Sequence, residues 1–237
     1  MKKLIIYIFL IINIFPATKS IGVFSGVNDN IYENKEKYFV FPFFSYRNKF
    51  ISVNGLNVGT SIPYKGVFYS LTLEPGFFQK VLEKGDLNGI IEEDRDSPIF
   101  LSLSASKNFK NFNLNSTYKR EFSSDGNLLG LGASYIYFFD KNYKYSLIPA
   151  INYWYFDGSY SDYYFNLTEE EYANLSKQYK SLDNTYSLDY SINSRIVLDE
   201  KSSLILSYKL NYISQNKIRQ DSKKYFDTFS LGYSYKF

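Results

Sequence analysis

The side chains of this sequence that could do acid–base or metal chemistry are carboxylates, lysines and tyrosines, because the chain contains no histidine and no cysteine. Without histidine, the usual Ser-His and Asp-His arrangements of hydrolases are excluded. Without cysteine, thiol nucleophiles and thiolate metal sites are excluded. A hydrolase using only carboxylates is the remaining alternative, and it requires paired groups with shifted pKa values. We therefore predict a non-enzymatic protein with no catalytic residue and no cofactor.

The densest group of oxygen ligands is the acidic run Glu92-Glu93-Asp94-Arg95-Asp96. Carboxylates of this kind can bind a divalent cation. The glycine-spaced pattern of a calcium loop is absent from the run. We interpret it as a solvated surface loop and predict no metal site.

The N-terminus has the three parts of an export signal. Met1-Lys2-Lys3 is followed by an apolar run from Leu4 to Phe15 and then by Pro16-Ala17-Thr18-Lys19-Ser20. The apolar run is shorter than the ~20 residues that a spanning helix needs, so a secretory signal is favoured over a membrane anchor. We predict a signal peptide over residues 1–20, cleaved after Ser20, and a single exported domain over 21–237.

The last residues of the chain alternate between two kinds of side chain. Successive side chains of a strand point to opposite faces, which places on one face the residues Phe229, Leu231, Tyr233, Tyr235 and Phe237, and on the other face small or charged residues. A half-buried strand of a soluble sandwich would show the same alternation. Together with the export signal, the pattern favours the closing strand of a bacterial outer-membrane β-barrel. Such strands commonly end in an aromatic residue that the assembly machinery reads, so these five residues form the predicted assembly signal.

The same alternation recurs along the chain in segments long enough to cross a bilayer when tilted. The segments are 38–46, 49–62, 66–75, 98–106, 111–120, 128–139, 143–155, 184–198, 202–213 and 225–237. Aromatic residues make up 20% of the chain, yet its mean hydropathy is −0.29. A barrel with an apolar lipid face and a polar lumen accounts for both values. Ten strands follow directly, and twelve follow if 21–27 is also a strand and 49–62 divides near Gly55.

From residue 62 onward, the connections between segments alternate in length. The short ones are 63–65, 107–110, 140–142 and 199–201, and the longer ones are 76–97, 121–127, 156–182 and 214–224. This alternation is typical of short periplasmic turns and longer extracellular loops. The predicted fold is therefore an all-β, closed antiparallel transmembrane β-barrel of 10 to 12 strands in the bacterial outer membrane. Within 156–182, Thr168 followed by Glu171 is a capping-box pattern that predicts a short helix over 168–180.

Five charged residues fall on the lumen face of the predicted strands: Lys119, Asp189, Arg195, Lys209 and Lys236. They either line a narrow conduit or pair with one another to fill the interior of a small barrel; we favour pairing. The net charge is only +3 and the two signs are interspersed, so no nucleic-acid surface is indicated.

Several short motifs occur in an order that resembles the MipA/OmpV family of outer-membrane proteins (the MltA-interacting protein type). They are Tyr32, Pro42, Tyr46-Arg47, Gly55-Leu56-Asn57-Val58-Gly59, Leu87-Asn88-Gly89, Tyr163-Tyr164-Phe165 leading into Glu169–Tyr179, and Tyr233-Ser234-Tyr235-Lys236-Phe237. The resemblance covers essentially the whole mature chain. The chain departs from the family at Asn166 and at Leu182-Asp183-Asn184, where a glycine is usual.

This resemblance implies an outer-membrane scaffold, since MipA-type members are associated with a lytic transglycosylase and with peptidoglycan synthesis. The expected partners are outer-membrane lipid, the assembly machinery and a murein enzyme. Two alternatives stay open: a narrow passive channel for small solutes, and a surface adhesin acting through residues 76–97 and 156–182.

Overall fold

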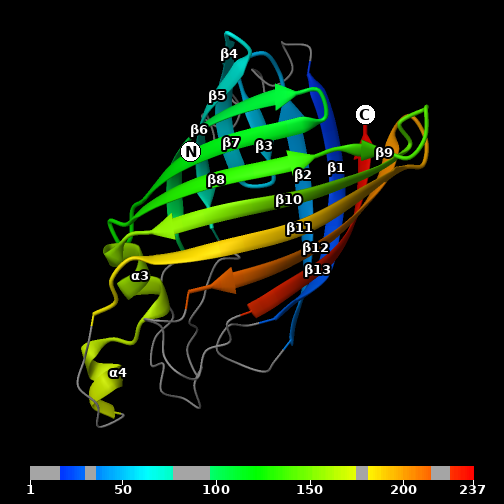
Figure 1. The fold of residues 1–237 in the computed structure, drawn as a ribbon. Helices are drawn as coiled ribbons and strands as arrows, with labels where there is room; N and C mark the ends of the chain where they lie inside the picture. Colours follow the sequence, from blue (N-terminus) through cyan, green and yellow to red (C-terminus); the bar gives the residue numbers. More distant parts are fainter. Residues whose placement is uncertain (1–16, 30–35, 77–96, 175–180, 215–224) are drawn as a thin grey trace, which may run out of the picture.

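The structure is a computed structural model that describes residues 17–29, 36–76, 97–174, 181–214 and 225–237. It consists of strands and two short helices (Figure 1). The strands are β1 (Thr18–Asp29), β2 (Glu36–Arg47), β3 (Ser52–Asn54), β4 (Asn57–Tyr64), β5 (Val67–Pro75), β6 (Ile99–Phe109), β7 (Phe112–Glu121), β8 (Asn127–Tyr135), β9 (Tyr137–Phe138), β10 (Tyr145–Phe156), β11 (Thr185–Val197), β12 (Ser202–Ile213) and β13 (Tyr225–Lys236). The helices are α3 (Gly158–Phe165) and α4 (Glu169–Asn174).

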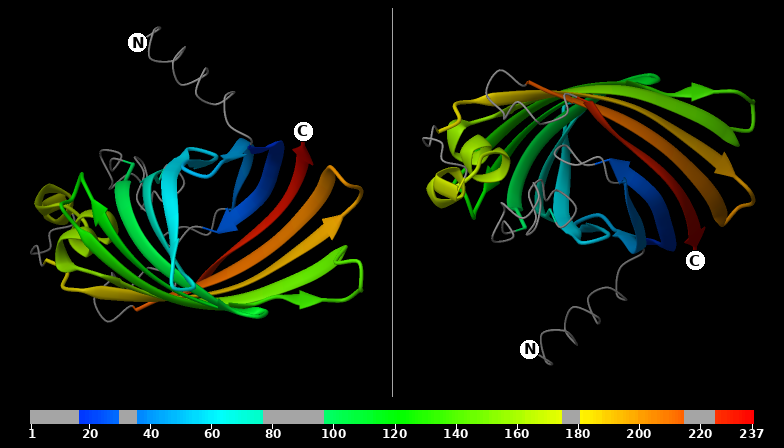
Figure 2. Two further views of the ribbon diagram at one scale, coloured as in Figure 1. Left: turned by 90° about the horizontal axis from the view of Figure 1, so that it is seen from above. Right: turned by 90° about the horizontal axis from the view of Figure 1, so that it is seen from below.

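The strands form one closed antiparallel barrel, which Figure 2 shows from above and from below. Each strand pairs with its neighbours in sequence, and β13 pairs with β1 from Ser20 opposite Lys236 to Asn28 opposite Thr228. A pairing of β10 with β11 completes the ring. Because β8 and β9 both pair with β10, they make a single wall strand interrupted at Ile136. The barrel therefore has twelve wall strands.

The predicted closed antiparallel barrel is confirmed, and its two alternatives for strand number are decided in favour of twelve. Both conditions for twelve hold: β1 spans the segment predicted at 21–27, and the segment 49–62 divides into β3 and β4 at Gly55. Gly55 has a φ of 62°. A two-residue hairpin needs such a positive φ, which glycine adopts without steric cost.

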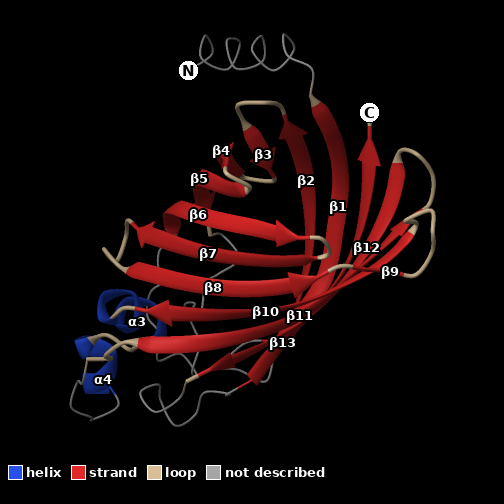
Figure 3. Ribbon diagram, turned by 45° about the horizontal axis from the view of Figure 1, so that its top comes forward, coloured by secondary structure: helices blue, strands red, loops and turns tan. Residues whose placement is uncertain are grey.

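The connections differ in length at the two ends of the barrel. The C-terminus and the connections 48–51, 65–66, 110–111, 139–144 and 198–201 lie at one end, which we call the short-turn end. Residues 157–174 and 181–184, with α3 and α4, lie at the other end (Figures 1 and 3). One connection on the long-loop side is short. It is the two-residue turn 55–56, which follows β3, a strand of only 3 residues. β2 consequently pairs with β3 at three positions, Ser45 to Arg47, although it pairs with β1 along its whole length.

The outer face of the wall is apolar and the inner face is mainly polar. On β13, Phe229, Leu231 and Tyr233 are 51%, 43% and 39% exposed, while Gly232 between them is buried. Exposed large apolar side chains at alternate positions are what a lipid-facing wall requires. Among the described residues, the structure contains no helix with the length and hydropathy needed to cross a membrane.

Buried apolar side chains collect at the long-loop end rather than along the middle of the barrel. The cluster consists of Phe100, Leu128, Phe156, Tyr160, Tyr164, Phe165, Leu167 and Ile213. Phe100, Leu128 and Phe156 come from the inner faces of strands, and Tyr160, Tyr164 and Phe165 come from α3. The helix thus packs on the inner wall of the barrel mouth by aromatic contacts, such as the stacked rings of Phe156 and Tyr160 at 5.3 Å.

The short helix predicted over 168–180 begins where its capping pattern indicated. The backbone N–H of Thr168 donates to Oε2 of Glu171 at 2.7 Å, and the N–H of Glu171 donates to Oγ1 of Thr168 at 3.2 Å. These two reciprocal bonds are a capping box. The second half of the prediction, residues 175–180, lies outside the described residues.

Candidate functional site

Two of the five predicted lumen residues form an ion pair. Nζ of Lys209, on β12, lies 3.0 Å from Oδ2 of Asp189, on the neighbouring strand β11. Asp189 is buried, whereas the Lys209 side chain is 43% exposed. A buried carboxylate in the wall needs a counter-charge, and Lys209 supplies it.

Lys119 pairs outside the predicted set of five. Its Nζ lies 2.5 Å from Oε2 of Glu74, which comes from β5, two strands away. The same ammonium group lies 5.2 Å from the ring centroids of both Phe100 and Trp154. Cation–π contacts of this length add to the ion pair. Lys119 is therefore held against the inner wall by three side chains from three different strands.

The other two predicted lumen residues lie apart from these pairs. Arg195 is exposed on β11, where it lies opposite Ser146 and Ile205. Lys236 is exposed at the short-turn end, opposite Ser20. Among the described residues, neither forms an ion pair. The structure thus brings together Asp189 and Lys209 and places the other three predicted residues separately.

A cavity of about 230 Å³ lies on the inner wall beside the Glu74–Lys119 pair. Phe41, the hairpin 54–57, the end of β5 at 74–76, and Phe100 line it. Its walls combine aromatic rings with the carboxylate of Glu74 and the amides of Asn54 and Asn57.

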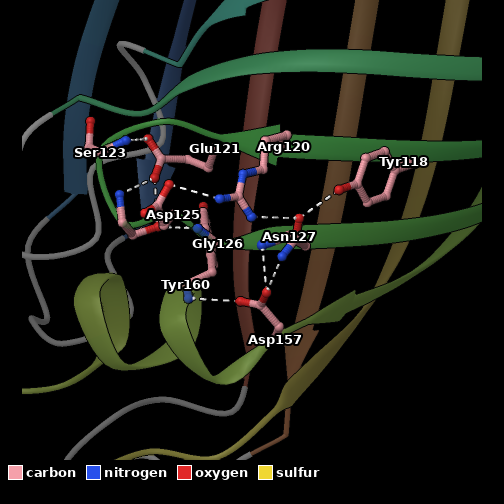
Figure 4. Close-up of polar contacts among 10 residues, drawn as sticks. Tyr118, Arg120, Glu121, Ser123, Asp125, Gly126, Asn127, Asp157 and Tyr160 are labelled. Atoms are coloured by element: carbon pink, nitrogen blue, oxygen red, sulfur yellow. Dashed lines mark hydrogen bonds and ion pairs between the residues drawn. The ribbon is translucent and has the colours of Figure 1, made fainter.

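A polar network holds α3 at the barrel mouth (Figure 4). Asp157 accepts from the backbone N–H of Tyr160 at 3.0 Å, which caps the helix. Its other oxygen accepts from the backbone N–H and the side-chain amide of Asn127, at 2.8 and 2.7 Å. Oδ1 of Asn127 in turn accepts from the Tyr118 hydroxyl at 2.6 Å and from Arg120 at 3.1 Å. The network therefore connects β7, β8 and the start of α3.

Glu121 is fully buried beside this network, and hydrogen bonds stabilise its negative charge. Its carboxylate accepts from the backbone N–H groups of Ser123 and Ser124, at 2.8 and 2.5 Å, and from the Ser124 hydroxyl at 2.6 Å. Burial, followed by the nearby charge of Glu121, raises the pKa of the Tyr160 phenol well above its ordinary value. The same two causes raise the pKa of Tyr164. These groups stay in one protonation state at neutral pH, so they anchor the mouth and are poorly suited to proton transfer.

In the part of the chain that the structure describes, no group of histidine, cysteine and acidic side chains is arranged to hold a metal ion. The acidic run at Glu92–Asp96 lies outside the described residues. The five residues of the predicted assembly signal all come from β13 and the terminal residue that follows it. Four of them, Phe229, Leu231, Tyr233 and Phe237, are at least 39% exposed on the lipid-facing side or at its rim.

Sequence reasoning missed Glu74 and helix α3. Glu74 stands at an alternating position like its neighbours, and no local pattern links it to Lys119, which lies 45 residues away. Helix α3 had a usable signal, since Asp157 before Gly158-Ser159-Tyr160 is a suitable N-cap.

The family model described as MltA-interacting protein MipA matches residues 21–237. The chain belongs to the MipA family. The resemblance that the sequence motifs indicated is thereby confirmed, and it extends over the whole predicted mature domain. None of the curated proteins compared with the chain matches it.

The chain has a fold similar to those of several solved porins and channels that are distant from it in sequence. The NanC porin is 10% identical with a TM-score of 0.48, over 92% of this chain and 100% of that chain. The KdgM porin is 11% identical with a TM-score of 0.44, over 92% and 99%. An outer membrane channel from Pseudomonas putida F1 is 13% identical with a TM-score of 0.44, over 94% and 96%. The family, together with the closed barrel and its apolar outer face, places this protein in the bacterial outer membrane.

Proposed function

We propose that this MipA-family barrel is a non-enzymatic scaffold that holds a lytic transglycosylase or a related murein enzyme at the outer membrane through its short-turn end. The observation that carries the proposal is the match of residues 21–237 to a family described by its interaction with MltA. The chain has no histidine and no cysteine, which removes the common nucleophilic and acid–base arrangements. A role in binding is therefore favoured over one in catalysis.

The connection 139–144 offers a defined contact surface at the short-turn end. Tyr143 is 65% exposed and has a φ of 58°, which is uncommon for a residue other than glycine. Asp140 fixes this turn: its Oδ2 accepts from the N–H of Asn142 and its Oδ1 from the N–H of Tyr145. The Tyr143 ring packs edge-on against Phe138 at 4.7 Å. A residue other than glycine with a positive φ and an exposed aromatic ring is a candidate for a functional position.

A substitution at Tyr143 tests the scaffold with little effect on the fold. Glycine adopts a positive φ freely, so Tyr143→Gly removes the ring and relieves the backbone. We expect the wild-type barrel to co-purify with a murein enzyme after cross-linking in envelopes, and we expect Tyr143→Gly to recover at least fivefold less of it. The matched control is Lys110→Gly, at another positive-φ position in a turn at the same end (φ 54°). Recovery of wild-type protein with no murein enzyme would reject the scaffold, and equal recovery by both variants would reject Tyr143 as its contact.

Recognition of β13 by the outer-membrane assembly machinery belongs to the same proposal. Phe237 is 58% exposed at the end of the strand, where an assembly factor would meet it before the barrel closes. We expect Phe237→Ala to lower the fraction of protein that migrates as a folded barrel in unboiled gel samples of outer membranes. An unchanged folded fraction would argue against this role.

A narrow passive channel is the second candidate, favoured by the polar lining of the lumen. The hydroxyls of Ser70 and Ser104 lie 2.6 Å apart on neighbouring inner faces, and both ion pairs described above face the interior. The aromatic cluster that joins α3 to the inner wall narrows the long-loop mouth, so any conductance should be small. Planar-bilayer recordings decide this question, because a purified folded barrel that gives no current steps is not a channel.

The adhesin alternative depends on the loops at the long-loop end. Most of the first loop, residues 77–96, lies outside the described residues. A binding assay with both loops, 76–97 and 156–182, deleted is the test of this hypothesis, and undiminished binding would discard it.

A further inference from the structure

Every connection at the short-turn end carries at least one exposed basic side chain. Going around the barrel, these residues are Arg47, Lys49, Lys65, Lys107, Lys110, Lys141, Lys144, Lys201 and Lys236. The acidic groups at this end are Asp140, Asp199, Glu200 and the C-terminal carboxylate of Phe237. Asp140 and Asp199 use their side chains to accept backbone N–H bonds within their own turns. The short-turn end therefore has a clear excess of positive charge, in a chain whose net charge is only +3.

Four of these lysines lie over aromatic rings, of which Phe50, Tyr64 and Phe109 are exposed and Tyr235 is half-buried. The ammonium group of Lys49 lies 5.7 Å from the centroid of Phe50, that of Lys65 lies 5.2 Å from Tyr64, that of Lys107 lies 5.1 Å from Phe109, and that of Lys201 lies 6.0 Å from Tyr235. The only other such contacts among the described residues are those of Lys119, inside the lumen. Among the described residues, the pairing of lysine with an aromatic ring outside the lumen is therefore a property of this end of the barrel.

Three of these rings lie on the lipid-facing side of the wall. Tyr64 and Phe109 continue the outward alternation of β4 and β6, where Ile62 and Leu103 are exposed, and Tyr235 continues that of β13. Aromatic rings at the ends of membrane strands lie at the level of the lipid headgroups. An ammonium group over such a ring is at the same level, within reach of phosphate oxygens.

We propose that these nine residues form a basic ring that binds the phosphate groups of anionic phospholipids in the membrane leaflet at the short-turn end. The distribution of the lysines favours lipid over a protein partner. A docked protein would cover one side of the barrel, whereas the basic residues occupy all six junctions between strands at this end. Lipid headgroups also surround the barrel on all sides. Each lysine near such a surface adds a favourable electrostatic contribution. The ring does not depend on the scaffold role proposed above.

The connections at the long-loop end are acidic as a set, although the segment 214–224 is basic, with Lys217, Arg219, Lys223 and Lys224 against Asp221. The segment 76–97 contains Glu83, Asp86, Glu92, Glu93, Asp94 and Asp96 against Lys80, Lys84 and Arg95. The segment 156–182 contains Asp157, Asp162, Glu169, Glu170 and Glu171 against Lys177 and Lys180. Anionic headgroups are therefore expected to favour the short-turn end.

Native mass spectrometry of the folded, detergent-purified full-length barrel tests the ring, with phosphatidylglycerol and phosphatidylcholine as probes. We expect wild-type protein to retain phosphatidylglycerol about tenfold more than phosphatidylcholine, and we expect this preference to weaken as salt screens the charges. The test variant carries Lys49→Gln, Lys65→Gln, Lys107→Gln and Lys201→Gln and should lose the preference. The matched control carries Lys177→Gln, Lys180→Gln, Lys223→Gln and Lys224→Gln, which remove the same charge from segments that follow α4 and β12, and it should keep the preference.

Three outcomes would overturn the ring. The first is equal retention of the two lipids by wild-type protein, and the second is an unchanged preference in the test variant. The third is lysine-dependent binding of polyglutamate without a preference for phosphatidylglycerol, which would assign the ring to an acidic protein. Gel mobility of unboiled samples confirms that each variant is a folded barrel before it is measured.

Discussion

The backbone N–H of Phe237 donates to the carbonyl oxygen of Lys19 at 3.1 Å, so the last residue of the chain is bonded to the start of β1. This bond lies at the seam where β13 and β1 close the barrel. Lys19 precedes the cleavage site that the sequence predicts, after Ser20. Residues 18–20 therefore belong both to the predicted signal peptide and to β1, the strand that closes the barrel with β13.

The first prediction concerns this seam. Cleavage after Ser20 would make Ile21, which lies opposite Tyr235, the first residue of the mature barrel, and the Phe237–Lys19 bond would be absent from it. The intact mass of protein purified from outer membranes is expected to correspond to residues 21–237. A mature chain that begins at Thr18 or Lys19 would retain the bond and would contradict the predicted site.

The second prediction concerns the anchor of α3. Asp157→Ala removes the cap of the helix and leaves the backbone N–H of Asn127 without its acceptor. The expected loss in the free energy of unfolding is about 2 kcal/mol, with faster proteolysis between residues 157 and 184. Asp125→Asn is the control, because Asp125 forms an exposed ion pair with Arg120 in the same network, worth about 0–1 kcal/mol, and asparagine tolerates the φ of 57° at this position. Equal effects of the two substitutions would show that the cap does not hold the helix.

The third prediction concerns alkaline pH. Burial raises the pKa of Tyr160 and Tyr164 above the ordinary value of 10.0. The folded state therefore keeps protons that the unfolded chain releases near pH 10. The stability that these groups contribute is complete below that pH and is lost as the pH rises beyond it.

We expect urea unfolding of the wild-type barrel to show this loss between neutral pH and pH values above 10. A double variant, Tyr160→Phe and Tyr164→Phe, has no phenols to ionise at these positions and should lose less stability over the same interval. The hydroxyl of Tyr164 has no hydrogen-bond partner among the described residues, so its removal should cost little at neutral pH. Parallel curves for the two proteins would contradict the assignment.

The fourth prediction concerns the ion pair in the lumen. Lys119→Met leaves the carboxylate of Glu74 in the wall without its counter-charge, and the expected cost is about 2 kcal/mol, between the values for exposed and fully buried pairs. The double variant with Glu74→Gln removes both charges and should recover most of this loss. The measurement is a double-mutant cycle of urea unfolding in detergent or lipid. Additive effects of the two substitutions would show that the pair is not coupled.

Short-range patterns in the sequence were enough to determine the class of fold. Alternation with a period of two assigns each strand residue to the lipid or the lumen face without knowledge of its neighbours. It therefore placed Phe229, Leu231 and Tyr233 on the outer face correctly. The capping box of Thr168 and Glu171 was found for the same reason, since all of its groups lie within four residues.

The tertiary structure decided how strands that are distant in sequence pair and which side chains they bring together. Closure fixed the wall at twelve strands, because β1 had to join β13 and the hairpin at Gly55 had to fit between β2 and β5. Register then placed Lys119 beside Glu74 and left Arg195 apart from Asp189. The physical reason is that the partner of a lumen side chain depends on the tilt and stagger of neighbouring strands, which local alternation does not encode.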